Sequence, residues 1–272
     1  MLALVCLLIV AGWFAVRLLW SDARARLLGE AATVSFLAWA GEQSCISWYG
    51  FYAYDPARWW VMVGSVPLTV LLIWPVVVIS ARDVVRVWLG ERSLPVAGLT
   101  LAVVITDAAF VEASAVHAGL WSWTVPGVFG VPVIGILGWG LYGGLVAAAL
   151  EQVGRRRHGW LALLAVLPAL HLALLALWWG GLRWLSVPVG DAVAAAAALV
   201  IGGAGLLAAL RLGGPVPIRL VTLRLPGAIF FVGLLALYPP STPLVVWLLA
   251  LSLPWLAMCL RGRRAPLSLP IG

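Results

Sequence analysis

The chain has 272 residues, of which 64% are hydrophobic and only 10% are charged. Its mean hydropathy of +1.09 excludes a soluble globular domain and indicates a polytopic membrane protein. The formal net charge is +7, but the arginines fall at the ends of apolar segments and not in one patch. This pattern is typical of membrane topology and argues against nucleic acid as a partner.

Apolar segments long enough to cross a bilayer, which takes roughly 20 residues, follow one another along the chain. They lie at about residues 2–20, 28–49, 60–81, 94–117, 127–150, 159–179, 189–210, 225–239 and 243–260. No polar linker divides them. We therefore predict an all-α fold, in which residues 1–272 form one transmembrane domain of eight or nine helices. The first segment has no basic start and no small-residue cleavage site, so we interpret it as a retained helix.

The arginines in alternate loops predict the orientation of these helices. On one side lie Arg24, Arg26, Arg82, Arg86, Arg92, Arg155, Arg156, Arg157, Arg211, Arg219, Arg224, Arg261, Arg263 and Arg264. Only Arg58 and Arg183 lie on the other side. Because cytoplasmic loops are rich in basic residues, nine spans place the N-terminus outside and the C-terminus in the cytoplasm. The expected location is the inner membrane of a bacterial cell.

Two stretches of the chain share an acidic residue followed by an aromatic motif. Glu42 is followed eight positions later by GFYAY, at residues 50–54. Glu112 is followed seven positions later by GLWSW, at residues 119–123. In both stretches the acid lies inside a predicted span, and the aromatic pair lies near the outer end of that span.

The same two stretches continue with a second shared element. Pro67 and Pro132 each follow a valine, and a tryptophan stands seven residues after each proline. We interpret the pattern as an internal two-helix repeat with copies at about 28–81 and 94–150. Both copies run outward and then back, so they are parallel repeats that can face each other around a shared cavity.

Three acidic residues within the spans are the candidate catalytic groups: Glu42, Asp107 and Glu112. A carboxylate in hydrocarbon costs about 2.5 kcal/mol or more, so such residues normally face a cavity and have a function. The alternative is a protonated acid that only joins helices by hydrogen bonds. A dry environment favours the neutral form, which could then act as a general acid.

Aromatic residues beside these acids are candidates for binding a substrate and stabilising a cation. They are Tyr52, Tyr54, Trp74, Trp121, Trp123 and Trp139, with His117 as a polar candidate near the outer surface. Proton addition to an alkene gives a carbocation, which aromatic faces attract. The competing interpretation is that the rings are packing residues and interfacial anchors.

The histidines and cysteines show no metal-ligand spacing. His117, His158 and His171 are scattered, and Cys6, Cys45 and Cys259 lie singly within apolar segments. We therefore expect no metal site and no disulfide.

These residues resemble a known family. Glu42 with GFYAY and VPLTVLLIW, and Asp107 and Glu112 with GLWSW and FGVPVIGILGW, are similar to the carotenoid biosynthesis family that includes the CruF-type carotenoid 1,2-hydratases (bisanhydrobacterioruberin and gamma-carotene hydratases). The similarity covers about residues 38–143. Two positions depart from the family pattern: Ala113 stands where proline usually follows the acid, and Gly135 with Ile136 stands in the region of an Asn-Phe pair.

The resemblance implies a hydro-lyase that adds water to the terminal double bond of an acyclic carotenoid, without a redox cofactor. Asp107 or Glu112 would protonate the alkene, and Glu42 would position or activate water. The expected partners are a polyene or isoprenoid substrate within the bilayer, membrane lipids and, as further candidates, other enzymes of the carotenoid pathway. The departures leave the substrate open.

Two alternatives remain open at the level of sequence. In a cyclase, an isomerase that uses the same acids, another alkene would capture the cation, and the missing Asn favours the drier pocket that this needs. In a proton-coupled transporter or lipid-binding membrane protein, the acids would relay protons.

Overall fold

The computed structural model describes residues 2–90, 95–212 and 216–262, and most of this part of the chain is helical. The helices are α1 (Leu2–Trp20), α2 (Arg24–Tyr49), α3 (Leu68–Leu89), α4 (Val96–His117), α5 (Val133–Arg155), α6 (Leu161–Leu177), α7 (Arg183–Leu185), α8 (Asp191–Leu212), α9 (Ile218–Thr222), α10 (Leu225–Leu237) and α11 (Thr242–Gly262). The shorter elements are β1 (Tyr52–Tyr54), the 3₁₀ turn η1 (Pro56–Arg58), β2 (Met62–Val63), β3 (Val66–Pro67), β4 (Trp121–Trp123) and the π-helical turn η2 (Trp178–Leu182). The all-α prediction is confirmed.

Within the described ranges, eight helical stretches are long and apolar enough to cross a membrane. They correspond to α1, α3, α4, α5, α6 with η2 and α7, α8, α9 with α10, and α11. The 26-residue α2 is not among them, since it carries several charged and polar side chains, but it packs against α3 and α6. The chain is a multi-pass membrane protein, as its composition predicts.

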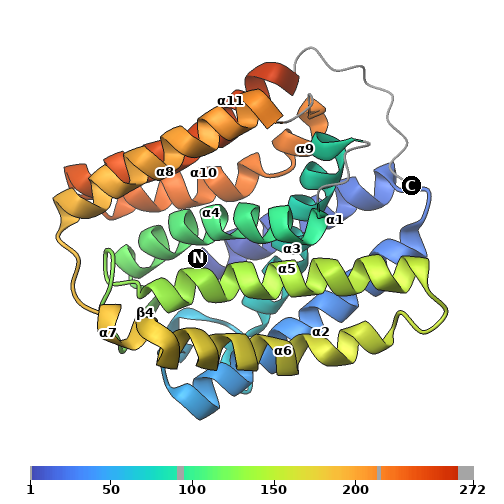
Figure 1. Ribbon diagram of the computed structural model, residues 1–272, viewed down its shortest axis with the longest axis horizontal. Helices are drawn as coiled ribbons and strands as arrows, with labels where there is room; N and C mark the ends of the chain where they lie inside the picture. The colour runs from blue at the N-terminus through green and yellow to red at the C-terminus, as the bar shows by residue number, and fades with distance from the viewer. Residues whose placement is uncertain (1, 91–94, 213–215, 263–272) are drawn as a thin grey trace.

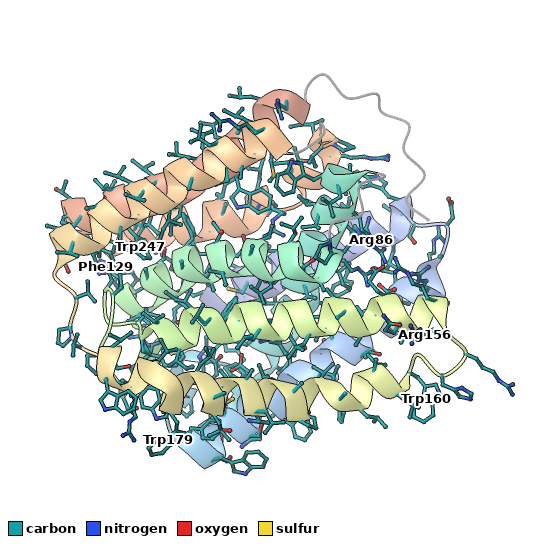
Figure 2. All side chains as sticks on the ribbon, in the orientation of Figure 1. Arg86, Phe129, Arg156, Trp160, Trp179 and Trp247 are labelled. Carbon is teal, nitrogen blue, oxygen red and sulfur yellow. The ribbon has the colours of Figure 1, made fainter. Side chains whose placement is uncertain are left out.

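The helices lie roughly side by side, as Figure 1 shows. In this view α4 and α5 run through the middle, α8, α10 and α11 lie above them, and α2 and α6 lie below. The exposed Trp160 and Trp179, one at each end of α6, point outward in Figure 2. Tryptophans at both ends of an apolar helix are typical of the two membrane interfaces.

Prolines determine where two of the central helices begin. Pro67 and Pro132 are the N-cap residues of α3 and α5, where an extended backbone and a missing N–H are tolerated. The predicted starts of these spans, at residues 60 and 127, are therefore wrong. The residues before Pro67 are apolar but form the β2–β3 hairpin, which turns at Gly64 (φ 66°).

Helices α4 and α5 pack closely through glycines. A Cβ atom at Gly143 would lie 2.9 Å from Val104 Cγ2, and one at Gly144 would lie 2.8 Å from Leu101 Cβ. Small residues allow such close approach between helices in a membrane. This contact fixes the relative position of two helices that line the site described below.

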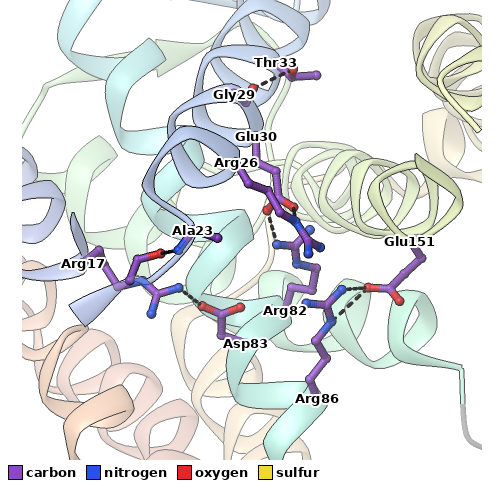
Figure 3. A network of polar contacts seen from close by, with 11 residues as sticks. Arg17, Ala23, Arg26, Gly29, Glu30, Thr33, Arg82, Asp83, Arg86 and Glu151 are labelled. Carbon is purple, nitrogen blue, oxygen red and sulfur yellow. Dashed lines mark hydrogen bonds and ion pairs between the residues drawn. The ribbon is translucent and has the colours of Figure 1, made fainter. Parts of the chain in front are cut away.

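Ion pairs join α1, α2, α3 and α5 at one end of the bundle (Figure 3). They are Arg17–Asp83 (2.6 Å), Arg82–Glu30, Arg26–Glu30 (3.1 Å) and Arg86–Glu151. They lie near the end of α1, the start of α2, the end of α3 and the end of α5, whereas strands follow α2 and precede α3 and α5. The ion pairs and the strands therefore lie at opposite ends of the bundle.

Candidate active site

Glu42, in α2, is buried at 8% exposure and both of its carboxylate oxygens accept hydrogen bonds. Trp74 Nε1, from α3, donates to Oε1 at 2.8 Å. The hydroxyl groups of Tyr52 and Tyr54, from β1, both donate to Oε2 at 2.8 Å. Three donors thus converge on one carboxyl group in an apolar region.

Glu112, in α4, is 2% exposed and has a similar set of partners. The indole N–H groups of Trp121 and Trp123, from β4, donate to Oε2 at 2.7 and 2.9 Å. The indole of Trp139, from α5, also interacts with this carboxyl group. Each acid is therefore held by its own aromatic motif and by a tryptophan seven residues after a Val-Pro pair.

A two-stranded ribbon brings the two motifs together. Strands β1 and β4 are antiparallel, with Tyr52 opposite Trp123 and Tyr54 opposite Trp121. Because side chains alternate along a strand, all four rings lie on one face of the ribbon, while the exposed Ala53 lies on the other. Ring centroids are 4.8 Å apart for Tyr52 and Trp123, and 5.9 Å apart for Tyr54 and Trp121.

Glycines with positive φ turn the chain from helix to strand in both motifs. Gly50 (φ 60°) directly follows α2, and Gly119 (φ 68°) follows α4 by one residue. This left-handed conformation is nearly free of strain only for glycine and commonly ends a helix. The turn directs the next three residues back over the acid on the preceding helix.

The two acids line one cavity of about 80 Å³. A water molecule requires roughly 10–15 Å³ of such space, so the cavity has room for a small branched hydrocarbon end. Its lining is mostly apolar and aromatic: Ala38, Gly41, Glu42, Cys45, Phe51, Tyr52, Tyr54, Trp74, Glu112, Trp121, Trp123, Ile134, Gly135, Gly138, Trp139, Tyr142, Leu170 and Leu174. A cavity with a few convergent polar groups is the usual form of a binding site.

The donors around the two acids limit where a proton can lie on each carboxyl group. The indole N–H can only donate, so a neutral Glu112 must carry its proton on Oε1 and not on the oxygen that two indoles occupy. At Glu42 both oxygens take part in hydrogen bonds, Oε1 with Trp74 and Oε2 with the two tyrosines. Two neighbouring acids that share one site commonly divide into a proton donor and a base.

The tyrosines of β1 remain neutral donors. Burial, followed by the nearby Glu42 carboxyl group, raises the pKa of Tyr52 and of Tyr54 well above the usual value of 10. Both hydroxyl groups therefore keep their protons at physiological pH and continue to donate to Glu42.

Asp107, a predicted catalytic acid, does not line this cavity. It pairs with Arg224, whose other terminal nitrogen donates to Ser80 Oγ at 2.5 Å. The guanidinium also lies 4.5 Å from the ring centroid of Trp255 in α11. An ion-paired carboxylate is a poor proton donor, so the structure places Asp107 in a contact between helices and not in the site.

His117, a predicted substrate-binding residue, is also outside the cavity. It is exposed at the end of α4, and its Nε2 lies 3.2 Å from the carbonyl oxygen of Tyr238 and 3.3 Å from that of Pro239. The other predicted residues do meet at the cavity: Glu42, Glu112, Tyr52, Tyr54, Trp74, Trp121, Trp123 and Trp139. Across the described residues, no three His, Cys, Asp or Glu side chains gather as a metal site would require.

Several cavity residues were not foreseen from the sequence. Tyr142 packs on Trp74 at 4.7 Å and donates to the carbonyl oxygen of Val34 at 2.6 Å. Gly135 lies under Trp123, since a Cβ atom there would meet Trp123 Cζ2 at 2.5 Å. The missing side chain at residue 135 thus leaves the space that the Trp123 ring occupies.

Fold and site together define a multi-pass membrane protein with two carboxyl groups buried in an aromatic cavity. A comparison with protein-family models matched residues 4–204 to the family described as carotenoid biosynthesis protein. This match covers most of the chain and every residue of the cavity, so the chain belongs to the carotenoid biosynthesis protein family and has a role in that pathway. Comparisons with curated proteins and with solved structures gave no match.

Proposed function

We propose that the protein is a cofactor-free hydratase that adds water to the terminal double bond of an acyclic carotenoid or a related polyprenyl chain. The observation that carries this proposal is the pair of buried acids, Glu42 and Glu112, in one aromatic, mostly apolar cavity. Family membership supports a carotenoid pathway, and the cavity supplies what alkene hydration needs.

In the first step, Glu112 acts as the general acid. Its Oε1 proton passes to the less substituted carbon of the terminal alkene, which leaves a tertiary carbocation and a Glu112 carboxylate. The indole donors of Trp121 and Trp123 strengthen their bonds to Oε2 as the negative charge develops. The aromatic faces around the cavity stabilise the cation.

In the second step, water captures the carbocation with the help of Glu42. The water oxygen bonds to the tertiary carbon and its proton passes to the Glu42 carboxylate. The product is a tertiary alcohol, and the sum of the two steps is the addition of one water. Return of a proton from Glu42 to Glu112 restores the starting state.

A cyclase is the competing outcome for the same acids. Residue 135 is glycine, so this position offers no polar side chain to hold a water, and the cavity lining is mostly apolar. An internal alkene could then capture the cation before water does. The product would have the mass of the substrate.

We also propose that residues 28–81 and 94–150 are the two copies of a parallel repeat within one transmembrane domain. The matching partners of Glu42 and Glu112 support this, and so does the antiparallel pairing of β1 with β4, which relates equivalent strands by an approximate two-fold axis. The charge pattern supports nine crossings of a bacterial inner membrane, with the N-terminus outside and the C-terminus inside.

Expression in a lycopene-producing bacterial host tests the function. We expect pigments that have gained one water per reacted end group, identified by mass, and no such product with Glu112→Gln. Asp107→Asn combined with Arg224→Met is the matched control, since both residues lie outside the cavity and the double variant should still make product per molecule of protein. Unchanged pigment mass with a shifted retention time would favour the cyclase, and unchanged pigment would refute both.

A further inference from the structure

The cavity is too small for a whole polyene. Its volume of about 80 Å³ accommodates the end of a chain, whereas a carotenoid contains many isoprene units. The rest of the substrate must therefore leave the cavity through one of its walls. The inference below rests on the proposed function, because it assumes a long apolar substrate.

Several walls of the cavity consist of hydrogen-bonded or tightly packed residues. The hydrogen-bonded ribbon of β1 and β4 covers the outer end, where Thr124 N also donates to the carbonyl oxygen of Phe51 at 2.8 Å. On another side, Trp74 packs against the rings of Trp139 and Tyr142, with centroid distances of 4.6 and 4.7 Å. On a further side, α5 packs tightly on α4 through its glycines.

The wall formed by α6 is different, because it consists of leucine side chains against small residues. Leu170 and Leu174 line the cavity. A Cβ atom at Gly41 in α2 would lie 3.7 Å from Leu170 Cδ2, and one at Gly138 in α5 would lie 3.6 Å from Leu174 Cδ2. The ends of flexible aliphatic side chains therefore fill the space next to Gly41 and Gly138 on this side.

A polar cluster joins α2 to α6 beside these leucines. Ser44 Oγ lies 2.9 Å from His171 Nε2, and Tyr49 Oη lies 2.9 Å from His171 Nδ1. Because Ser44 donates its own proton to the Ala40 carbonyl oxygen at 2.6 Å, His171 Nε2–H is the donor to Ser44, and Nδ1 accepts from Tyr49. The side chain of His171 thus bridges the two helices.

The end of α6 is also irregular. It continues into the π-helical η2, where Gly181 departs from helical geometry. Such interruptions are common at functional sites and at helix kinks. In Figure 1 this part of the chain lies at the end of α6 next to α7 and β4.

We propose that the seam between α2 and α6 is the lateral portal through which the polyene enters from the bilayer and along which its unreacted part lies. Gly41 and Leu170 form the opening, and Leu174, which lies against Gly138 of α5, borders it on the cavity side. His171, with its hydrogen bonds to Ser44 and Tyr49, holds the seam closed when no chain occupies it.

Reversible cross-linking of the seam tests the portal. The test uses a double variant that combines Ser44→Cys with His171→Cys. A cysteine at position 171 is shorter than the imidazole that reaches Ser44 in the wild type, so a short bifunctional methanethiosulfonate is used to join the two thiols. The purified protein in lipid vesicles containing lycopene is assayed before cross-linking, after it, and after reduction. The two single-cysteine variants, treated with the same reagent, control for reaction at native cysteines.

We expect loss of both hydration and bound pigment on cross-linking, and recovery of both on reduction. Full pigment binding by protein whose cross-link is verified by mass would overturn the portal. Wild-type protein that binds pigment but does not hydrate it would instead refute the proposed function. In that case the portal would still be tested by comparing pigment binding before and after cross-linking.

A second variant tests the same idea without a cross-link. His171→Leu removes both hydrogen bonds across the seam and retains an apolar side chain, so we expect faster uptake of pigment from vesicles than by wild type. An unchanged uptake rate would contradict the role of His171 in closing the seam.

Discussion

Replacing Trp123 with phenylalanine removes one N–H donor from Glu112 and keeps an aromatic ring in the cavity. The bond it removes is 2.9 Å long and joins Trp123 Nε1 to Glu112 Oε2. If Glu112 gives up its proton during the reaction, the acceptor of this hydrogen bond changes from a neutral carboxylic acid to a carboxylate. The Trp123→Phe variant therefore measures how much negative charge develops on Glu112.

The magnitude follows from the strengths of the two kinds of bond. A neutral hydrogen bond contributes about 1 kcal/mol and one to a charged group about 1.5–3 kcal/mol, so the transition state loses roughly 0.5–2 kcal/mol more than the ground state. At about 1.4 kcal/mol per tenfold change, the rate should fall by roughly 2- to 30-fold. Because Trp121 still donates to the same oxygen at 2.7 Å, we expect a value in the lower half of this range.

The assay is the initial rate of hydration by purified protein in vesicles that contain saturating lycopene. Trp247→Phe is the matched control, since its indole also donates at 2.9 Å, but to the Ala109 carbonyl oxygen outside the cavity (Figure 2 labels Trp247). The control should keep the wild-type rate. A wild-type rate for Trp123→Phe, or an equal decrease in both variants, would refute the assignment of Glu112 as the acid.

Three further predictions follow from the site and its surroundings. Glu42→Gln keeps the shape of the side chain but cannot take a proton from water, so hydration should fall by about 100-fold or more while pigment still binds; a small effect in the same rate assay would exclude Glu42 as the base. Asp107→Asn leaves the partly buried Arg224 without its ion-pair partner, which should cost about 3 kcal/mol of stability, the lower end of the range for buried pairs. A lower midpoint of thermal unfolding would show this cost, which Asp107→Asn with Arg224→Met should largely relieve; an unchanged midpoint in the single variant would contradict it. Gly135→Val should displace the Trp123 ring and lower the hydration rate, and adding Trp123→Ala should recover thermal stability but not the rate; a wild-type rate for Gly135→Val would show that the ring is not constrained there.

The sequence predicts much of the fold because a long apolar segment strongly indicates a membrane-spanning helix. The length of the segment does not determine at which residue the helix begins, however. Residues 60–67 are largely apolar, yet they form a hairpin and not the first turns of α3. Pro67 has no N–H to donate within a helix, so α3 begins after it, and Gly64 permits the turn. The proline at a span boundary was the local signal for this difference.

The pairing of acids with aromatic residues could be predicted because the relevant residues are close in the chain. Tyr52 and Tyr54 are 10 and 12 positions from Glu42, and a glycine turn returns them over the same helix. The two motifs also resemble each other, as the copies of a repeat do, and parallel repeats can face each other around a shared cavity.

The partners of the remaining residues depend on distant helices. Arg224 is 117 positions from Asp107 and lies outside the family match. The charge pattern predicts only that Arg224 lies in a loop at one end of a span, and not that its side chain reaches Asp107. Leu170 and Leu174 are two among many leucines of α6, and their sequence context does not separate them from lipid-facing neighbours. Periodicity places a side chain on a face of a helix but does not say which helix that face meets.

In the proposed reaction a carboxylic acid protonates carbon, and water captures the resulting cation. Running this reaction in deuterated water reports on both steps, because the exchangeable proton of Glu112 then becomes deuterium. We predict a tertiary alcohol with one carbon-bound deuterium next to the new hydroxyl group at each reacted end, located by mass spectrometry and NMR, and none of this product with Glu112→Gln. A hydroxylated pigment without carbon-bound deuterium would contradict protonation of the alkene.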